Sequence, residues 1–174
     1  MKPDRRIAII ALSIIAFDQL TKAVVVRFME RYSEVVVIDG FFRFVHWGNT
    51  GAAWSMFHGN NEFLAIVSLI ALAGLVLLRS NFGTEHMIGQ VAVGLICGGI
   101  AGNAIDRLFV GHVTDFLYFY LYPRGSLGEA GFPAFNVADS AICVGAVCLA
   151  ITSYFHHQTQ IPRRAEAPQG ENGS

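Results

Sequence analysis

Four long apolar stretches constrain the fold of this chain more than any other feature. A helix needs roughly 20 predominantly apolar residues to cross the hydrocarbon core of a bilayer, with a range of about 17 to 25. The stretches occupy residues 7–28, 63–78, 87–105 and 137–155, and the second, being slightly short, is expected to include flanking residues. Only 14% of the residues are charged, against about 25% in soluble domains. We therefore predict an all-α polytopic membrane protein with four transmembrane helices.

Basic residues near the ends of these stretches predict the orientation of the chain. Lys2, Arg5 and Arg6 precede the first stretch, and Arg79 lies in the short loop after the second. Because basic residues favour the cytoplasmic side, we expect both termini in the cytoplasm, although three arginines fall in the segment expected outside. The first stretch begins like a secretory signal, but Asp18 follows its apolar run where a cleavage site would stand, so we expect a retained helix.

The chain is expected to form a single domain over residues 1–157, because no linker or internal repeat divides it. Residues 158–174 are rich in Pro, Gln, Gly and Glu and are expected to be a disordered cytoplasmic tail. The net charge of −1 indicates no nucleic-acid partner. The three cysteines fall inside predicted helices, and no Cys/His grouping suggests a zinc site.

The segment between the first two apolar stretches is predicted to form a small extracytoplasmic β-hairpin. Residues 35–38 and 41–45 are rich in β-formers, and Asp39-Gly40 between them is a strong signal for a two-residue turn. We expect the hairpin to lie on the membrane surface, and the aromatic residues 116–122 to form an interface belt. A short interfacial helix over residues 54–58 is also expected.

Small residues on two of the predicted helices indicate close packing. Gly94, Gly98 and Gly102 recur every four residues on the third stretch, and Ala141 and Gly145 repeat the pattern more weakly on the fourth. Such a face lets another helix approach closely.

Polar residues gather at the outer ends of the predicted helices. Asp18 and Lys22 lie four residues apart and can pair on one helix face. Asn136 is placed to cap the fourth helix. The residues expected to converge at this depth, near the outer leaflet, are Asp18, Lys22, Asn49, Asn103, Asp106, Arg107, Asp115, Asn136, Asp139 and Ser140.

Two aspartates of this set are candidates for catalysis. Asp115 and Asp139 lie beside apolar runs, where an ionised carboxylate is expensive and usually functional. If they face each other, one can hold a proton while the other stays charged, as in an aspartyl hydrolase that activates water. The other members have structural alternatives: an ion pair for Asp18 and Lys22, a positioning role for Asp106, and ordinary caps and hydrogen bonds for the asparagines.

Five motifs occur in order along the chain and together carry a family resemblance. They are Phe17-Asp18-Gln19-Leu20-Thr21-Lys22, Asn49-Thr50-Gly51-Ala52-Ala53-Trp54-Ser55, Gly102-Asn103-Ala104-Ile105-Asp106-Arg107, Gly111-His112-Val113-Thr114-Asp115-Phe116 and Phe135-Asn136-Val137-Ala138-Asp139-Ser140. From about residue 5 to about residue 155 the chain closely resembles the lipoprotein signal peptidases of bacteria (signal peptidase II).

The resemblance implies a four-helix fold in the bacterial inner membrane with a small extracytoplasmic β-cradle. It implies an aspartyl endopeptidase, without cofactor or metal, that cuts prolipoproteins just before a diacylglyceryl-modified cysteine. The family's catalytic pair falls on Asp115 and Asp139. The supporting residues are Asn49, Gly51, Asn103, Asp106, Arg107 and Asn136, with Asp18 and Lys22 bracing the site. Membrane lipids as partners, a monomeric state and inhibition by a cyclic peptide of the globomycin type are further expectations.

Two functions of other classes compete with this one. A small proton- or ion-coupled transporter also uses intramembrane acids, but its site typically lies near the bilayer midplane between repeated halves. Here the acids gather at one end and the sequence shows no repeat. A non-catalytic membrane scaffold would leave both aspartates without a chemical role.

Overall fold

Four helices follow the four apolar stretches. The computed structural model describes residues 1–51, 57, 59–122 and 128–160, with side chains up to residue 153. The helices are α1 (Pro3–Phe28), α2 (Asn61–Leu77), α3 (Met87–Phe109) and α4 (Val137–Gln160), and a short 3₁₀ helix, η2 (Arg79–Phe82), follows α2. The interfacial helix expected over residues 54–58 and the tail beyond residue 160 lie outside the described residues, apart from residue 57. Residues 158–160, expected in the disordered tail, belong to α4.

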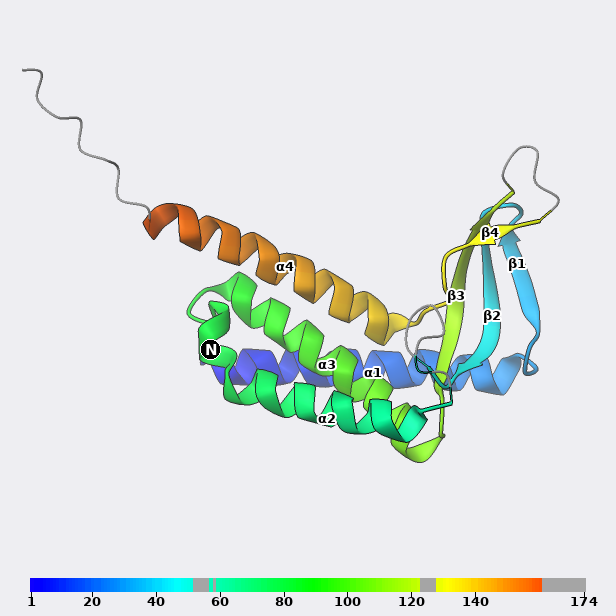
Figure 1. Ribbon diagram of the computed structural model, residues 1–174, viewed down its shortest axis with the longest axis horizontal. Coiled ribbons are helices and arrows are strands. Elements are labelled where there is room, and N and C mark those ends of the chain that lie inside the picture. The colour runs from blue at the N-terminus through cyan, green and yellow to red at the C-terminus, as the bar shows by residue number, and fades with distance from the viewer. Residues whose placement is uncertain (52–56, 58, 123–127, 161–174) are drawn as a thin grey trace, which may run out of the picture.

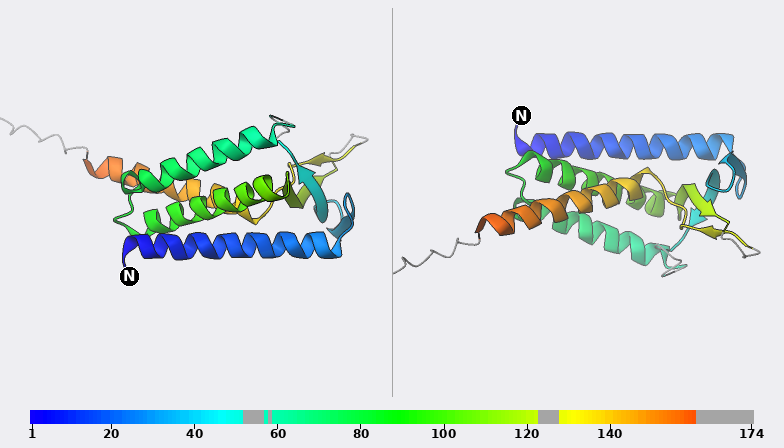
Figure 2. Two further views of the ribbon diagram at one scale, coloured as in Figure 1. Left: turned by 90° about the horizontal axis from the view of Figure 1, so that it is seen from below. Right: turned by 90° about the horizontal axis from the view of Figure 1, so that it is seen from above.

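The helices lie side by side with the sheet at one end of the bundle, opposite the N-terminus (Figures 1 and 2). The central element is α3, which contacts each of the other three helices. By length and composition α1 and α3 are suited to cross a membrane, whereas α2 and the described part of α4 are apolar but shorter. Large apolar side chains remain exposed on the outside of the bundle, as at Leu20 (62%) and Ile70 (67%). Exposed apolar surface of this extent is typical of a membrane or protein contact.

Glycines let α3 approach its neighbours closely, as their spacing predicted. A Cβ at Gly98 would lie 2.8 Å from the carbonyl oxygen of Ala11 in α1, and one at Gly102 would lie 2.7 Å from Oδ2 of Asp18. On α4, a Cβ at Gly145 would meet the α3 backbone at 2.8 Å. Because real Cβ contacts are not this short, larger residues would force these helices apart, and with them the polar groups at their outer ends.

The end of the bundle is covered by an antiparallel sheet of the order β1-β2-β3-β4. Its strands are β1 (Glu34–Ile38), β2 (Phe42–Asn49), β3 (Val113–Leu121) and β4 (Ala130–Gly131). Strands β1 and β2 form the hairpin predicted from the sequence. Strands β3 and β4 were not predicted from the sequence, and most of the aromatic segment expected as an interface belt is part of β3. The alternation in β3 buries Tyr118 and Tyr120 on one face, as the period of two of a strand requires.

The hairpin turn differs from the prediction. Ile38 pairs with Phe42, so the turn has three residues instead of two. Its middle residue, Gly40, has φ +72°, a left-handed conformation that glycine adopts without a steric penalty. The Phe41 amide donates to the Ile38 carbonyl oxygen at 3.1 Å and closes the turn.

Candidate active site

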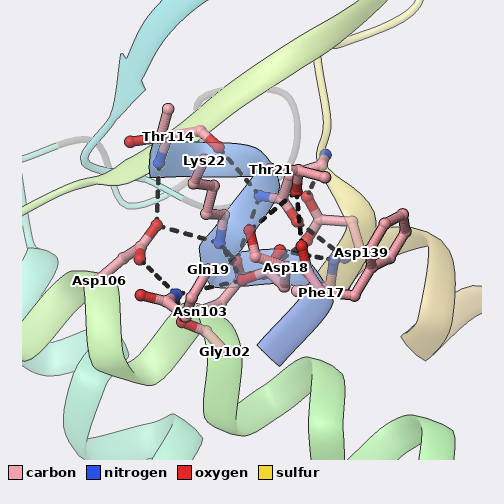
Figure 3. A network of polar contacts seen from close by, with 12 residues as sticks. Phe17, Asp18, Gln19, Thr21, Lys22, Gly102, Asn103, Asp106, Thr114 and Asp139 are labelled. Carbon is pink, nitrogen blue, oxygen red and sulfur yellow. Dashed lines mark hydrogen bonds and ion pairs between the residues drawn. The ribbon is translucent and has the colours of Figure 1, made fainter. Parts of the chain in front are cut away.

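The sequence-predicted polar residues meet where the ends of α1, α3 and α4 nearest the sheet adjoin strand β3. Figure 3 shows five of them: Asp18, Lys22, Asn103, Asp106 and Asp139. Helix α1 provides Asp18 and Lys22, helix α3 provides Asn103, Asp106 and Arg107, and helix α4 begins beside Asn136 with Asp139 in its first turn. Strand β3 provides Asp115, while Asn49 ends β2 and Gly51 follows it. The convergence predicted from the sequence is therefore present.

Lys22 lies at the centre of a cluster of buried charges. Its Nζ lies 2.7 Å from Oδ2 of Asp18 and 3.0 Å from Oδ2 of Asp106, and it donates to Oδ1 of Asn103 at 2.9 Å. The expected Asp18–Lys22 pair is thus confirmed, but it is part of a larger cluster. Lys22 is 4% exposed, Asp18 0% and Asp106 3%. Charges this deeply buried require partners, because removal of one leaves another uncompensated away from water.

The first turn of α4 is capped reciprocally. The Asp139 amide donates to Oδ1 of Asn136 at 3.0 Å, and the Asn136 amide donates to Oδ2 of Asp139 at 3.2 Å. This arrangement is a capping box with an aspartate as its acidic member, and it confirms the predicted capping role of Asn136. The next free amide, of Ala138, donates to Oδ1 of Asp18 at 2.9 Å. The two bonds with Asn136 thereby fix the Asp139 side chain at the start of α4, and the bond with Asp18 holds this turn against α1.

Asn136 also connects the two aspartates that we refer to as the carboxylate pair, Asp115 and Asp139. Its Nδ2 donates to Oδ1 of Asp115 at 2.8 Å. Two further amides complete the set: Asn49 donates to Oδ2 of Asp115 at 3.0 Å, and Asn103 donates to Oδ1 of Asp139 at 2.8 Å. Three asparagine side chains therefore direct their NH₂ groups at the carboxylate pair, which leaves the carboxylates as acceptors.

Burial dominates the electrostatics of Asp115, which is 3% exposed. Burial raises the pKa of Asp115 to about 7, and the charge of Asp139 acts in the same direction, against the hydrogen bonds from Asn49 and Asn136. A carboxyl group with such a pKa exchanges its proton near neutral pH, as a general acid or base must.

Arg107 of α3 contacts Gly51, which follows β2. Nη2 of Arg107 donates to the Gly51 carbonyl oxygen at 3.2 Å, and the Gly51 amide donates to Oδ1 of Asn49 at 2.9 Å. The buried Nε of Arg107 has no hydrogen-bond partner within the described residues. Arg107 thus connects the segment after β2 to α3, and its charge acts on both members of the carboxylate pair.

Three contributors to the site were not singled out from the sequence. Nε2 of Gln19 donates to Oδ1 of Asp106 at 2.9 Å, and the Thr114 amide donates to Oδ2 of the same carboxylate at 3.1 Å. Asn61 donates to the Arg107 carbonyl oxygen at 2.9 Å. Gln19 could have been suspected from the sequence because it lies between Asp18 and Lys22. The Thr114 bond could not, because it uses a backbone amide, which every residue except proline has.

A helical bundle with a predominantly apolar exterior and a cluster of buried carboxylates and amides at one end defines a membrane enzyme. Comparison with known proteins agrees with this class. A solved structure described as a bacterial membrane enzyme, determined in meso at 2.3 Å resolution, matches with a TM-score of 0.77 and 29% identity, covering 91% of this chain and 93% of that one. A second, determined in meso at 1.9 Å, matches with a TM-score of 0.70 and 32% identity over 83% and 90%.

The family follows from sequence comparison. The model of the signal peptidase (SPase) II family matches residues 10–155. The lipoprotein signal peptidase of Bacillus pumilus is 39% identical over 143 residues, 82% of this chain and 88% of that protein. That of Symbiobacterium thermophilum is 36% identical over 159 residues, 91% and 97% respectively. The chain belongs to the signal peptidase II family and is therefore a peptidase, and these relatives give no support to the transporter alternative.

Proposed function

We propose that this peptidase is an aspartyl endopeptidase of the membrane that removes signal peptides from prolipoproteins. The relatives are lipoprotein signal peptidases, which supports the substrate class. The observation that carries the aspartyl type is the carboxylate pair: two carboxylates on different elements, connected by Asn136. In the described residues no group of three or more His, Cys, Asp or Glu side chains is arranged to hold a metal ion.

The cut is proposed to fall on the N-terminal side of a cysteine that carries a diacylglyceryl group. The acyl chains of such a substrate stay in the bilayer beside the helices while the peptide bond reaches the carboxylate pair at the bundle's outer end. Recognition of the lipid therefore needs no aqueous pocket. The Arg107 guanidinium is suited to hold a carbonyl or ester oxygen of the substrate, because Arg provides several donors in a fixed geometry.

Hydrolysis follows from a pair of carboxyl groups that holds one proton. Two carboxylates that share a site repel each other, so one pKa is raised and the pair keeps a proton near neutral pH. The charged member takes a proton from a water molecule, which attacks the scissile carbonyl carbon. The protonated member donates to the carbonyl oxygen, and the amine leaves after protonation. Asn49, Asn103 and Asn136 orient the pair, and the Lys22 cluster positions α1 and α3 around it.

The setting of the enzyme is proposed from the same features. All four helices cross the bacterial inner membrane, both termini lie in the cytoplasm, and the carboxylate pair lies near the extracytoplasmic leaflet with the sheet above it. Residues 1–157 form one peptidase domain that acts as a monomer without a cofactor, and residues 158–174 form a cytoplasmic tail. The exposed apolar surface of α1 and α2 and the basic residues at the start of α1 support this placement.

The direct test is cleavage of a prolipoprotein with and without its diacylglyceryl cysteine by the purified wild type and by Asp115→Asn and Asp139→Asn. Cleavage of the lipidated substrate alone, lost or greatly slowed in either folded variant, is the expected result. Cleavage at the wild-type rate in either variant removes that aspartate from the pair and directs attention to Asp106. A globomycin-type peptide is expected to inhibit the wild-type reaction.

A further inference from the structure

We infer that the carboxylate pair is asymmetric: Asp139 is the ionised member that activates water, and Asp115 carries the proton. This assignment rests on the proposed function, since it gives the two aspartates of the aspartyl peptidase different roles. It follows from the different elements that hold them and from the direction of the hydrogen bonds around each.

Asp139 occupies a position that favours negative charge. It is the third residue of α4, and its Oδ2 accepts the Asn136 amide at the helix N-terminus. The N-terminus of a helix carries the equivalent of roughly half a positive charge and stabilises an anion in the first turn. Oδ1 of Asp139 accepts the Asn103 side chain at 2.8 Å. Both oxygens of Asp139 accept N–H donors, as those of Asp115 also do. The difference is that one donor to Asp139 is a main-chain amide at the N-terminus of the helix that carries it.

The direction of the Asn103 bond is fixed by Lys22. Oδ1 of Asn103 accepts the Lys22 ammonium at 2.9 Å and Nδ2 of Asn136 at 3.2 Å, so its NH₂ group has to point toward Asp139. An ammonium, an amide and a carboxylate thus form a chain of bonds with one polarity. Hydrogen bonds in such a chain strengthen one another, and the chain directs the positive end of the Asn103 dipole at Asp139.

Asp115 lacks both of these advantages. It lies in strand β3 and not in the first turn of a helix, and it is 3% exposed. Its hydrogen bonds come from two neutral side chains, Asn49 and Asn136. Desolvation disfavours a charge there, and the pKa of about 7 for Asp115 agrees with this geometry.

The charged groups around the pair reinforce the difference. Asp115 is affected by the negative charge of Asp139 and by Lys22 of α1. Asp139 is affected by Lys22 and Asp18 of α1. Arg107 of α3 interacts with both members of the pair and with Asp106. Since the two cations are common to both aspartates, the helix N-terminus and the Asn103 chain decide which member is ionised.

The assignment fixes every proton in the reaction. Asp139 takes a proton from water while the water oxygen bonds to the scissile carbonyl carbon, and Asp115 gives its proton to the carbonyl oxygen. In the second step Asp139 returns the proton to the amide nitrogen as the carbon–nitrogen bond breaks. Asp115 then recovers its proton from the hydroxyl of the tetrahedral intermediate, which becomes the new carboxyl group. The pair ends in its starting state.

Infrared difference spectroscopy of the purified protein at pH 6 tests the assignment without activity. Asp115→Asn is expected to lose a carbonyl stretching band of a protonated carboxylic acid that Asp139→Asn retains. Glu85→Gln is the matched control, since this side chain is 55% exposed, and it is expected to change neither this band nor cleavage. Any other pattern would overturn the assignment. These patterns are a band lost only in Asp139→Asn, a band lost in both variants, a band kept in both, and no such band in the wild type.

Single-turnover cleavage across pH separates this inference from the proposed function. Asp115→Asn still presents a neutral donor, so it is expected to keep slow cleavage that no longer falls above about pH 7. Asp139→Asn removes the base and is expected to lose more, in the range of about 10²- to 10⁴-fold for general base catalysis. Wild-type rates in either variant would refute the catalytic pair itself. Two outcomes would refute only the assignment. In the first, both variants are slow but Asp139→Asn cleaves faster than Asp115→Asn. In the second, the cleavage rate of Asp115→Asn still falls above about pH 7.

Discussion

At the scale of single residues, the site depends on one lysine that is buried between two aspartates. Lys22 lies 2.7 Å from Asp18 and 3.0 Å from Asp106, and through Asn103 it also reaches the carboxylate pair. A lysine so far from water is stable because every direction of its ammonium group meets an acceptor. Its replacement would therefore affect stability before it affects chemistry.

Lys22→Met is expected to destabilise the protein by about 3–5 kcal/mol, the usual cost of breaking a buried ion pair. The substitution keeps the length and apolar part of the side chain but leaves two carboxylates without their cation. Thermal unfolding in detergent measures the effect, with Lys2→Met as the control because Lys2 is exposed at the N-terminus. Equal melting temperatures for the two variants would contradict the role of Lys22 as the centre of the buried charge cluster.

Asp115 makes the stability of the protein depend on pH. Its pKa rises from the ordinary 3.8 to about 7 on folding, so the folded state binds this proton more tightly than the unfolded state. The resulting stabilisation is complete below about pH 4 and is lost as the pH rises through about 7, on the order of 1.4 kcal/mol per pKa unit. Asp115→Asn cannot ionise. The unfolding free energy of the variant minus that of the wild type is therefore expected to be larger at pH 8 than at pH 5. Unfolding experiments at both pH values measure this difference, and an equal difference at the two would disprove the prediction.

At the scale of secondary-structure elements, the start of α4 combines capping with positioning. Asn136 uses its oxygen to cap the helix and its NH₂ group to hold Asp115. A residue that caps equally well but lacks the NH₂ group separates the two functions. Serine is such a residue.

Asn136→Ser is expected to retain the stability that Asn136→Ala loses, about 1 kcal/mol for a helix cap. Both variants are expected to cleave about 2- to 10-fold more slowly, because the lost hydrogen bond to the protonated Asp115 joins neutral groups and contributes roughly 0.5–1.5 kcal/mol. Unfolding and cleavage measured on the same preparations distinguish the two effects. If Asn136→Ser cleaves like the wild type, the hydrogen bond to Asp115 does not position the pair.

The contact of α3 with α1 sets the alignment of the polar residues at the helix ends. In Gly98→Ala the new Cβ would lie 2.8 Å from the Ala11 carbonyl oxygen, and we expect a loss of about 1–3 kcal/mol from overpacking. Gly74→Ala in α2 is the control, since no heavy atom lies within 4 Å of that position. There alanine is expected to be neutral or slightly stabilising, by its helix propensity. Similar unfolding for both variants would show that the helices can separate without cost.

At the scale of the whole molecule, the polar site and the sheet lie at one end of the bundle and the N-terminus at the other (Figure 1). In the proposed orientation Asp39 of the hairpin turn lies on the extracytoplasmic side of the membrane. Glu85, between α2 and α3, lies in the cytoplasm. In a variant with the three cysteines replaced by alanine, Asp39→Cys is expected to react with a membrane-impermeant maleimide in intact cells. Glu85→Cys is expected to react only after the membrane is permeabilised. The opposite pattern would invert the proposed topology.

The helices, the hairpin and much of the candidate site could be predicted from the sequence. Apolar runs of helix length predicted α1 to α4, glycine spacing predicted close helix packing, and the i, i+4 spacing of Asp18 and Lys22 predicted their ion pair. Asn136 was recognised as a cap because capping is local, depending on residues within one turn. The motifs also indicated the family, and the family match over residues 10–155 confirms it.

Which polar groups share hydrogen bonds could not be predicted from the sequence, because it depends on how the elements pack. Gln19 bonds to Asp106, which lies 87 residues later in the sequence, and Asp18 bonds to the start of α4, 120 residues later. Local spacing carries no information on the rotation and depth of one helix against another, which here depend on glycine contacts between backbones. Strand β3 was missed because its strand geometry is stabilised by pairing with β2, a partner that lies more than sixty residues earlier. The asymmetry of the carboxylate pair depends on the same placement, since it arises where a helix begins beside a strand.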